Sequence, residues 1–235
     1  MSAQVLADCE GTFATLCEAF PAIHSDMDWW IPVNCALLRE GETTVLVDTG
    51  VGPQPRTFLP ELETTLLGQL EPEAVDIVVH THLHIDHVGW TGLFPNARYV
   101  VHEDDWAYFM SESSLAERPH LREKVLPLAE QFELVSGEAE IAPGVRVQPA
   151  PGHTPGHLIV RAGGYAAIGD LVAHELQVVD PDLVFVNDVD SDVAAATRRR
   201  IVAELAEEGA AVIAGHFRGI GRFERAGKGF RWAVE

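Results

Sequence analysis

Short apolar runs separated by polar turns recur along the chain, and each run is too short to form a helix. Such runs occupy residues 75–79, 97–101, 145–147, 165–168 and 211–214. We expect each to be a buried β-strand. Residues 35–39 and 43–47 flank a Glu-Gly-Glu turn and predict a hairpin. Residues 221–223 and 230–232, around Ala-Gly-Lys, predict a second hairpin that closes a sheet edge.

Helical spacing is clearest over residues 192–208, where the apolar positions are Val193, Thr197, Ile201 and Leu205. The segment begins with acidic residues and is followed by Gly209, a typical helix stop. Arginines 198–200 in its middle are interpreted as a solvated face. A second helix is expected from residue 103 or 104 through 110. Strands alternating with helices indicate an α/β protein, and the length of 235 residues favours one domain, residues 1–235.

Residues 82–87, His-Leu-His-Ile-Asp-His, place four metal-binding side chains within six positions. They follow the expected strand 75–79, at the end where α/β sheets usually carry their chemistry. Imidazole and carboxylate together suit zinc, and also iron, manganese or nickel. Histidines on a solvated loop that binds nothing are the alternative, but this density favours a metal site.

Three further motifs follow other expected strands: Gly-His-Thr-Pro-Gly-His at residues 152–157, Gly169-Asp170 and Gly215-His216. Taken singly, a Gly-Asp or Gly-His pair is more typical of a turn. Their joint occurrence indicates that several strands deliver His153, Asp170 and His216 to the rim that carries the first cluster.

This order of motifs resembles the metallo-β-lactamase superfamily, from about residue 34 to residue 216, and Asp48-Thr49-Gly50 matches its first motif. The resemblance implies a four-layered α/β/β/α sandwich that holds two divalent metal ions, with zinc expected and iron or manganese as alternatives. By the same resemblance, one ion would be held by His82, His84 and His153 and the other by Asp86, His87 and His216. Asp170 would bridge the two ions, and Asp48 would orient a ligand.

The resemblance also suggests a branch of the superfamily. A bridging aspartate is typical of lactonases, glyoxalase II-type thioesterases and phosphotriesterase-like members, whereas antibiotic-degrading members generally lack it. The region 125–157 is similar to N-acyl-homoserine lactonases and their esterase and methyl parathion hydrolase-like relatives. Those lactonases place a tyrosine three residues after the bridging aspartate, where this chain has Ala173. We therefore consider His174 as the replacement donor to a substrate's carbonyl oxygen.

The expected function is a dinuclear metal-dependent hydrolase that cleaves a lactone, ester or thioester by attack of a metal-bridged hydroxide. Asp86, Asp170 and His174 form the expected catalytic set, with Asp86 passing a proton to the leaving group. The alternatives are a phosphotriesterase-like hydrolase and an iron-dependent, persulfide dioxygenase-like oxidoreductase. Four aromatic residues are candidates for the walls of a substrate pocket, with ordinary core packing as the alternative: Trp29, Trp30, Trp106 and Tyr108.

A formal net charge of −20 disfavours nucleic acid and anionic membranes as partners and leaves a small molecule as the expected substrate. Cys9, Cys17 and Cys35 lack Cys-x-x-Cys spacing and fit reduced thiols. No apolar run approaches the roughly 18 residues of a membrane span, and no basic region with an apolar core opens the chain. We expect a cytoplasmic protein whose oligomeric state is open, with a homodimer as one option.

Overall fold

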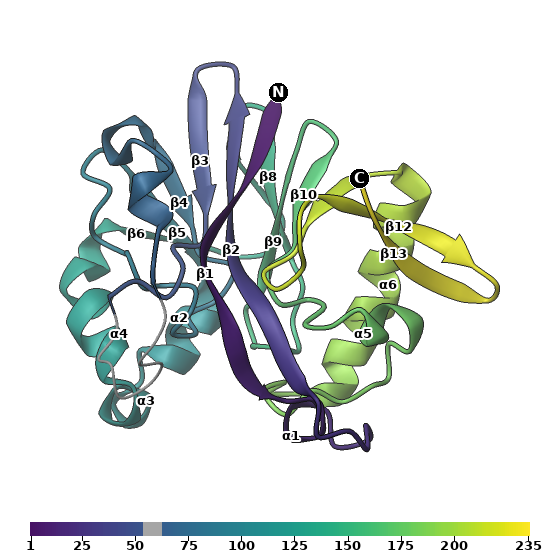
Figure 1. Ribbon diagram of the computed structural model, residues 1–235. Helices are drawn as coiled ribbons and strands as arrows, with labels where there is room; N and C mark the ends of the chain where they lie inside the picture. Colours follow the sequence, from purple (N-terminus) through teal and green to yellow (C-terminus); the bar gives the residue numbers. More distant parts are fainter. Residues whose placement is uncertain (54–62) are drawn as a thin grey trace.

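Two β-sheets form the centre of the computed structural model, which describes residues 1–53 and 63–235 (Figure 1). The first sheet contains, in spatial order, β1 (Ser2–Thr15), β2 (Asp28–Glu40), β3 (Thr43–Val47), β4 (Ile77–Val79), β5 (Arg98–His102) and β6 (Phe132–Val135). Strands β1 to β3 are antiparallel, and β3 to β6 are parallel.

The second sheet contains β13 (Gly229–Val234), β12 (Gly221–Ala226), β11 (Ala211–Ile213), β10 (Tyr165–Ala167), β9 (Leu158–Ala162), β8 (Val145–Pro149) and β7 (Ala139–Ala142). Neighbouring strands are antiparallel except β10 and β11, which are parallel. The terminal hairpin β12–β13 therefore closes one edge of this sheet, as its sequence predicts.

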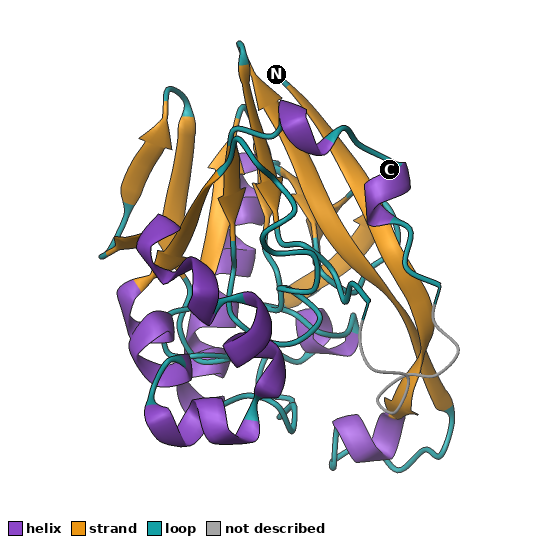
Figure 2. Ribbon diagram, turned by 90° about the vertical axis from the view of Figure 1, so that its left-hand side faces the viewer, coloured by secondary structure: helices purple, strands orange, loops and turns teal. Residues whose placement is uncertain are grey.

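Helices lie on the outer side of each sheet. Figure 1 shows α2 (Glu103–Phe109), α3 (Glu112–Glu117) and α4 (Pro119–Lys124) beside the first sheet, and α5 (Leu176–Val179) and α6 (Ser191–Glu208) beside the second. Short 3₁₀ turns occupy Leu66–Gly68, Pro72–Ala74 and Leu126–Gln131. The layers follow the order α/β/β/α (Figure 1), which confirms the expected fold. Figure 2 shows the molecule from the side of the first sheet, coloured by secondary structure. Within the described ranges, no helix has the length and apolar character needed to cross a bilayer.

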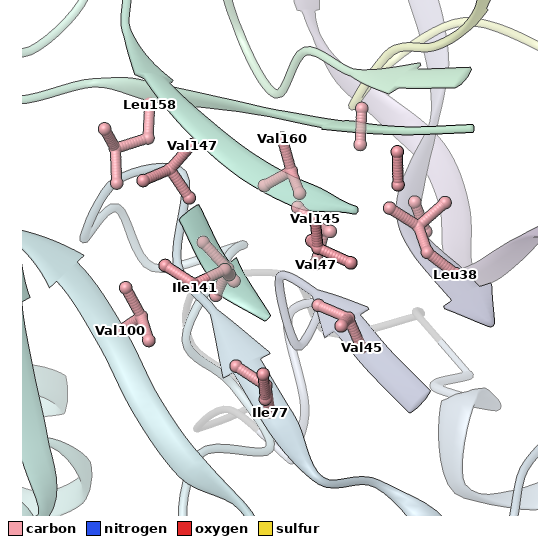
Figure 3. Packing of buried hydrophobic residues seen from close by; sticks show 14 of the residues in the cluster. Leu38, Val45, Val47, Ile77, Val100, Ile141, Val145, Val147, Leu158 and Val160 are labelled. Carbon is pink, nitrogen blue, oxygen red and sulfur yellow. The ribbon is translucent and has the colours of Figure 1, made fainter. Parts of the chain in front are cut away.

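The main core lies between the sheets and is built almost entirely from β-branched and small apolar side chains (Figure 3). Val45 and Val47 of β3 belong to it, together with Val147 and Val160 of the opposite sheet. The intervening residue Leu46 faces outward into a second cluster under the 3₁₀ turns. Because both faces of these strands are buried, the sequence shows continuous apolar runs and not alternation.

The predicted long helix is confirmed as α6. The Asp190 side chain accepts a hydrogen bond from Val193 N at 3.0 Å, and Gly209 ends the helix at φ +64°. The interpretation of its arginines as a solvated face is wrong for one of them. Arg199 and Arg200 are exposed, but Arg198 is 1% exposed.

Two strands at the start of the chain differ from the prediction. β2 begins before the predicted strand 35–39 and includes residues 29–31, and the fourteen-residue β1 that pairs with it has no counterpart in the predicted elements. Together they form a twisted ribbon that runs beyond the sheet and ends at α1 (Leu16–Ala19) (Figure 1). This ribbon carries Trp29 and Ile31 to the site described next.

Candidate metal centre

All seven predicted metal ligands lie at one edge of the two sheets. His82, His84, Asp86 and His87 occupy the loop that leaves β4, and His153 lies between β8 and β9. Asp170 follows β10 and His216 follows β11. The sheets face each other, so loops from sequence positions more than 100 residues apart meet here.

Asp170 lies at the centre of the group. Its Oδ1 is 3.4 Å from His87 Nε2, while its Oδ2 is 3.5 Å from His153 Nε2 and 3.3 Å from His216 Nε2. His84 joins through its other nitrogen, because His84 Nδ1 lies 3.1 Å from His153 Nε2. The carboxylate of Asp170 thus faces histidines that come from both halves of the chain.

Three overlapping groups have ligand atoms within 4.8 Å of one another: His82, His84 and His153; His82, His87 and Asp170; and Asp86, His87 and His216. Three of these atoms, His82 Nε2, His87 Nε2 and Asp170 Oδ1, are buried without a hydrogen-bond partner. Buried polar atoms are normally paired, and leaving them unpaired is costly. Nitrogen and oxygen atoms that converge in this way fit a pair of divalent cations.

The outward-facing nitrogens of the ligand histidines are also held. His87 Nδ1 is 2.8 Å from Asp48 Oδ2, His153 Nδ1 is 3.0 Å from Asp188 Oδ1, and His216 Nδ1 is 3.0 Å from Pro32 O. An acceptor at Nδ1 fixes the proton there and leaves the Nε2 lone pair directed inward. The Nε2 of each of these three imidazoles is therefore directed toward Asp170 at the centre of the ligand group.

Asp48 holds its position through an unusual backbone conformation, with φ +62°. Its Oδ1 accepts a hydrogen bond from Thr81 N at 2.7 Å, and its Oδ2 accepts one from Thr81 Oγ1 at 2.8 Å. The carboxylate therefore links the strand that precedes the histidine loop to His87. This geometry suits the orienting role that the resemblance implies for Asp48.

The second histidine of the Gly-His-Thr-Pro-Gly-His motif supports a ligand from behind. Burial lowers the pKa of His157 to about 3, so its ring is neutral, and His157 Nε2 accepts a hydrogen bond from Asp170 N at 3.1 Å. Gly169, at φ +47°, precedes that aspartate, and a Cβ there would lie 2.6 Å from Thr81 Oγ1. The glycine of the Gly-Asp pair is thus required by close packing.

Charge is unevenly distributed among the ligands. Burial lowers the pKa values of His82 and His84 well below the ordinary range, so both rings are neutral. Burial also opposes a charge on His216, but the Asp170 carboxylate outweighs it and raises the pKa of His216 to about 9. Asp170, Asp48 and Asp86 likewise outweigh burial and raise the pKa of His87. Without metal, protons on these two histidines offset the carboxylates.

A cavity of about 600 Å³ opens above the ligands. Its apolar lining consists of Phe13, Trp29, Ile31, Ile85, Pro119 and Phe185, and its polar wall consists of Glu117, Arg118, His120, Glu123 and Asn187. Asp86, Asp170, His84, His153 and His216 reach it from below. The volume is that of a typical small-molecule site.

The predicted aromatic wall is partly present. Trp29 lines the cavity, whereas Trp30 lies on a neighbouring hollow, where Arg218 packs over its ring. Trp106 packs against Phe132 with ring centroids 5.0 Å apart, and Tyr108 is exposed and outside the residues that line the cavity. The two aromatic residues of α2 are therefore not pocket walls: Trp106 packs against another ring, and Tyr108 lies on the surface.

His174 does not reach the metal-facing cavity. It lines the neighbouring hollow of about 410 Å³, which shares Trp29 and His216 with the cavity. Its ring packs edge-on against Phe20 and Trp29, and its Nδ1 accepts a hydrogen bond from Leu176 N at 3.1 Å. Ala173 is buried among apolar side chains.

Sequence reasoning missed several residues of the cavity, namely Phe13, Arg118, His120, Phe185 and Asn187. Of these, His120 on α4 is the most reactive type of side chain. Burial lowers the pKa of His120 to about 4, and its Nε2 is buried without a hydrogen-bond partner. No local motif marks this histidine. Its place in the charged stretch between Trp106 and Val135 is the one sequence feature that could have pointed to it.

Comparison with known proteins agrees with this geometry. Residues 28–216 match the metallo-beta-lactamase superfamily, and the chain belongs to that superfamily. It is 33% identical over 147 residues to an N-acyl homoserine lactonase of a Bacillus species, a match that covers 54% of this chain and 56% of that protein. The chain thus spans little more than half the length of this curated relative.

Solved structures show the same fold over nearly the whole chain. The dizinc quorum-quenching lactonase AidC, in complex with a product N-hexanoyl-L-homoserine, has a TM-score of 0.86 at 21% identity, covering 99% of this chain and 94% of that one. The hydrolase AbOPH of the beta lactamase superfamily has a TM-score of 0.82 at 24% identity, covering 99% and 94%. The predicted family, fold class and likeness to lactonases are confirmed.

Proposed function

We propose that this member of the metallo-β-lactamase superfamily is a dinuclear metal-dependent hydrolase that cleaves a lactone, ester or thioester. One observation carries the proposal: seven nitrogen and oxygen ligands, three of them with buried atoms that lack a partner, converge at the floor of a largely apolar cavity. The likeness to lactonases supports the substrate class.

The ligand groups assign the ions. His82, His84 and His153 would hold one, Asp86, His87 and His216 would hold the other, and Asp170 would contact both. Histidine nitrogens with few carboxylates favour zinc, with iron and manganese as the alternatives. When bound, two divalent cations lower the pKa of coordinated water and polarise a substrate's carbonyl group.

Asp86 is placed to handle the proton of the reaction. Its side chain is 21% exposed, against 5% for the side chain of Asp170, and it lines the cavity. Asp86 Oδ2 also lies 3.6 Å from both His87 Nε2 and His216 Nε2. A carboxylate that faces both the ligand cluster and the cavity can take up a proton and pass it to the leaving oxygen or sulfur.

The walls of the cavity favour an uncharged acyl substrate. The apolar side, with Trp29 and Phe185, can pack against an acyl chain and exclude water. Glu117 and Glu123 lie on the polar side, Arg118 is the one arginine or lysine among the described residues that line the cavity, and the net charge is −20. This field disfavours phosphate monoesters and other multiply charged substrates.

His120 takes the place that sequence reasoning gave to His174. The neutral imidazole of His120 lies on the wall of the metal-facing cavity, so a modest rotation of the side chain would offer its N–H to a substrate oxygen. Ala173 has no hydrogen-bonding side chain, and His174 lines the neighbouring hollow. We therefore assign His120 as the donor to be tested first and keep His174 as the second candidate.

The test is a substrate panel run on protein loaded with zinc, manganese or iron. It includes N-acyl homoserine lactones, aryl esters, thioesters, a phosphotriester and a penicillin, with the His82→Ala, His84→Ala double variant, which lacks two ligands of one ion, as the control. Turnover of an acyl substrate that the control lacks is the expected result. Turnover confined to the phosphotriester or the penicillin would overturn the proposal, as would oxygen uptake with a persulfide in place of hydrolysis.

A further inference from the structure

A buried arginine lies behind the metal centre. Arg198 projects from the middle of α6 and is 1% exposed. Its Nε donates to Leu171 O at 3.0 Å, its Nη1 donates to Pro181 O at 2.7 Å, and its Nη2 donates to Asp188 Oδ2 at 3.2 Å. All three nitrogens of the guanidinium therefore donate hydrogen bonds, each to a different residue of the chain outside α6.

Stability alone is a weak reason for such an arrangement. The side chains of Arg198 and Asp188 are 2% and 1% exposed, so both charges have lost their hydration. The desolvation cost of a buried ion pair often equals or exceeds the attraction between its members. This ion pair also contacts a candidate metal ligand, because the other carboxylate oxygen of Asp188, Oδ1, lies 3.0 Å from His153 Nδ1.

The contact at Nδ1 decides how His153 presents itself. A carboxylate acceptor keeps the proton on Nδ1, which leaves the Nε2 lone pair free. That Nε2 lies 3.1 Å from His84 Nδ1 and 3.5 Å from Asp170 Oδ2, at the centre of the ligand group. Arg198 in turn holds the Asp188 carboxylate through one Nη2–H bond, and the guanidinium is itself fixed because its Nε and Nη1 donate to Leu171 O and Pro181 O.

The same arginine also reaches the second half of the site. Leu171, whose carbonyl it binds, directly follows Asp170. The segment that carries Asp188 is joined to the His153 turn by two backbone bonds, Val189 N to His153 O at 3.1 Å and Asp190 N to Gly152 O at 2.9 Å. Gly152 has φ +130°, and a Cβ there would lie 2.2 Å from Ala194 N of α6.

We propose that Arg198 and Asp188 are positioning residues that fix the tautomer and orientation of His153 and thereby set the affinity of the ion held with His82 and His84. The proposal rests on the metal centre described above but is independent of the substrate. Metal content of the unaltered protein tests the centre, and the comparison between variants tests the role of this pair.

The experiment measures zinc dissociation constants and release rates by competition with a chromogenic chelator. Asp188→Asn and Arg198→Met should each weaken the binding of one of the two ions by about 10- to 100-fold, the range for losing an outer hydrogen-bond partner of a metal ligand. The double variant should be no weaker than the worse single variant, because the two residues act as one unit. Arg198→Lys, which keeps the charge but lacks the fork, should fall between Arg198→Met and the unaltered protein.

Arg199→Met is the matched control. Arg199 is the next residue of the same helix, is exposed, and forms an ion pair with Asp182. Its replacement should leave zinc affinity within about twofold, since an exposed pair contributes little.

The sign of the change separates the possible roles. If Arg198 acted only as a nearby positive charge, its removal would tighten zinc binding by removing repulsion. If it acted only in stability, the melting temperature of the metal-free protein would fall while zinc affinity stayed the same. Either result overturns the proposal.

Nitrogen-15 NMR of the histidine rings gives a readout that does not depend on Arg198→Met folding. In the unaltered protein, His153 should carry its proton on Nδ1, and Asp188→Asn should broaden or shift that resonance. A His153 protonated at Nε2 in the zinc-loaded, unaltered protein would refute the assignment.

Discussion

Asp8, on the strand that the sequence did not predict, should be one of the most sensitive positions for stability. Its side chain is fully buried in the first sheet. Asp8 Oδ2 accepts hydrogen bonds from Val51 N at 2.9 Å and Gly52 N at 3.0 Å. Asp8 Oδ1 accepts them from Leu66 N at 3.0 Å and Trp90 Nε1 at 2.9 Å.

The substitution Asp8→Asn keeps the shape but converts one acceptor oxygen into a donor. Whichever way the amide turns, two of the four N–H groups lose their acceptor and face another N–H. Leaving a buried donor unpaired costs about 1–3 kcal/mol, so the free energy of unfolding should fall by roughly 2–6 kcal/mol. For a chain of this size, each kcal/mol corresponds to about 2–4 °C in melting temperature.

Urea unfolding of the zinc-loaded protein, followed by tryptophan fluorescence and circular dichroism, measures this change. Glu10→Gln is the control, because Glu10 lies two residues farther along the same strand and is exposed. It should change the unfolding free energy by less than about 0.5 kcal/mol. A loss below about 1 kcal/mol for Asp8→Asn would refute the reasoning from its four hydrogen bonds.

Three further outcomes are expected. Gently purified protein should carry about two transition-metal ions per chain by elemental analysis, and His216→Ala should lose mainly one; a value well below one ion after reconstitution would contradict the dinuclear centre. His120→Ala should lower the catalytic rate by ~10- to 1,000-fold with the metal count intact. If His174→Ala lowers the rate by this amount and His120→Ala does not, His174 is the donor. Burial lowers the pKa of His80 to about 4, so the unfolded chain binds a proton near pH 6.5 that the folded protein refuses. His80 should therefore contribute a fall of about 1.4 kcal/mol per pH unit to the unfolding free energy as the pH drops from 6.5 to 4, and His80→Gln should reduce the measured slope by that amount; an unchanged slope would be evidence against a neutral, buried His80.

The meeting of the candidate ligands at one edge could be predicted because each lies in a short motif directly after a buried strand. Apolar runs place the strands, and the carboxyl ends of parallel strands meet at one edge of a sheet. His82 and His216 could thus be assigned to one site although 134 residues separate them. The order of motifs added the pairing of ligands, which spacing alone could not decide.

The first strand could not be predicted by the same means. It contains Asp8 and Gly11, and its pattern of apolar and polar residues is irregular. Asp8 is tolerable in the core only because its four partners arrive from positions 43 to 82 residues away. Such partners are invisible to any local pattern. The ribbon built from this strand delivers Phe13 to the cavity, so this part of the wall was missed with it, whereas Trp29 of the paired strand was named as a candidate.

The burial of Arg198 could not be predicted for a related reason. Three successive arginines on an otherwise polar helix face look alike in sequence, and burial distinguishes only one of them. Its partner Asp188 lies in a loop between Phe185 and α6, with no motif of its own. The sequence shows that this helix face carries charged residues, whereas the burial of each charged side chain depends on which loop packs over it.

The two ion positions should therefore respond to different parts of the molecule. The group of Asp86, His87 and His216 lies beside a second carboxylate, because Asp48 accepts a hydrogen bond from His87. The hydrogen bonds that Thr81 donates to Asp48 are neutral and leave its negative charge in place. That charge attracts a cation, but it attracts protons as well, because the Asp170 carboxylate outweighs burial and raises the pKa of His216 to about 9, so metal and protons compete there. The group of His82, His84 and His153 consists of imidazoles, two of them held neutral by burial, and the carboxylate behind His153 is already paired with Arg198. Proton competition is weak at this second position. Its affinity depends instead on how well α6 keeps His153 in place.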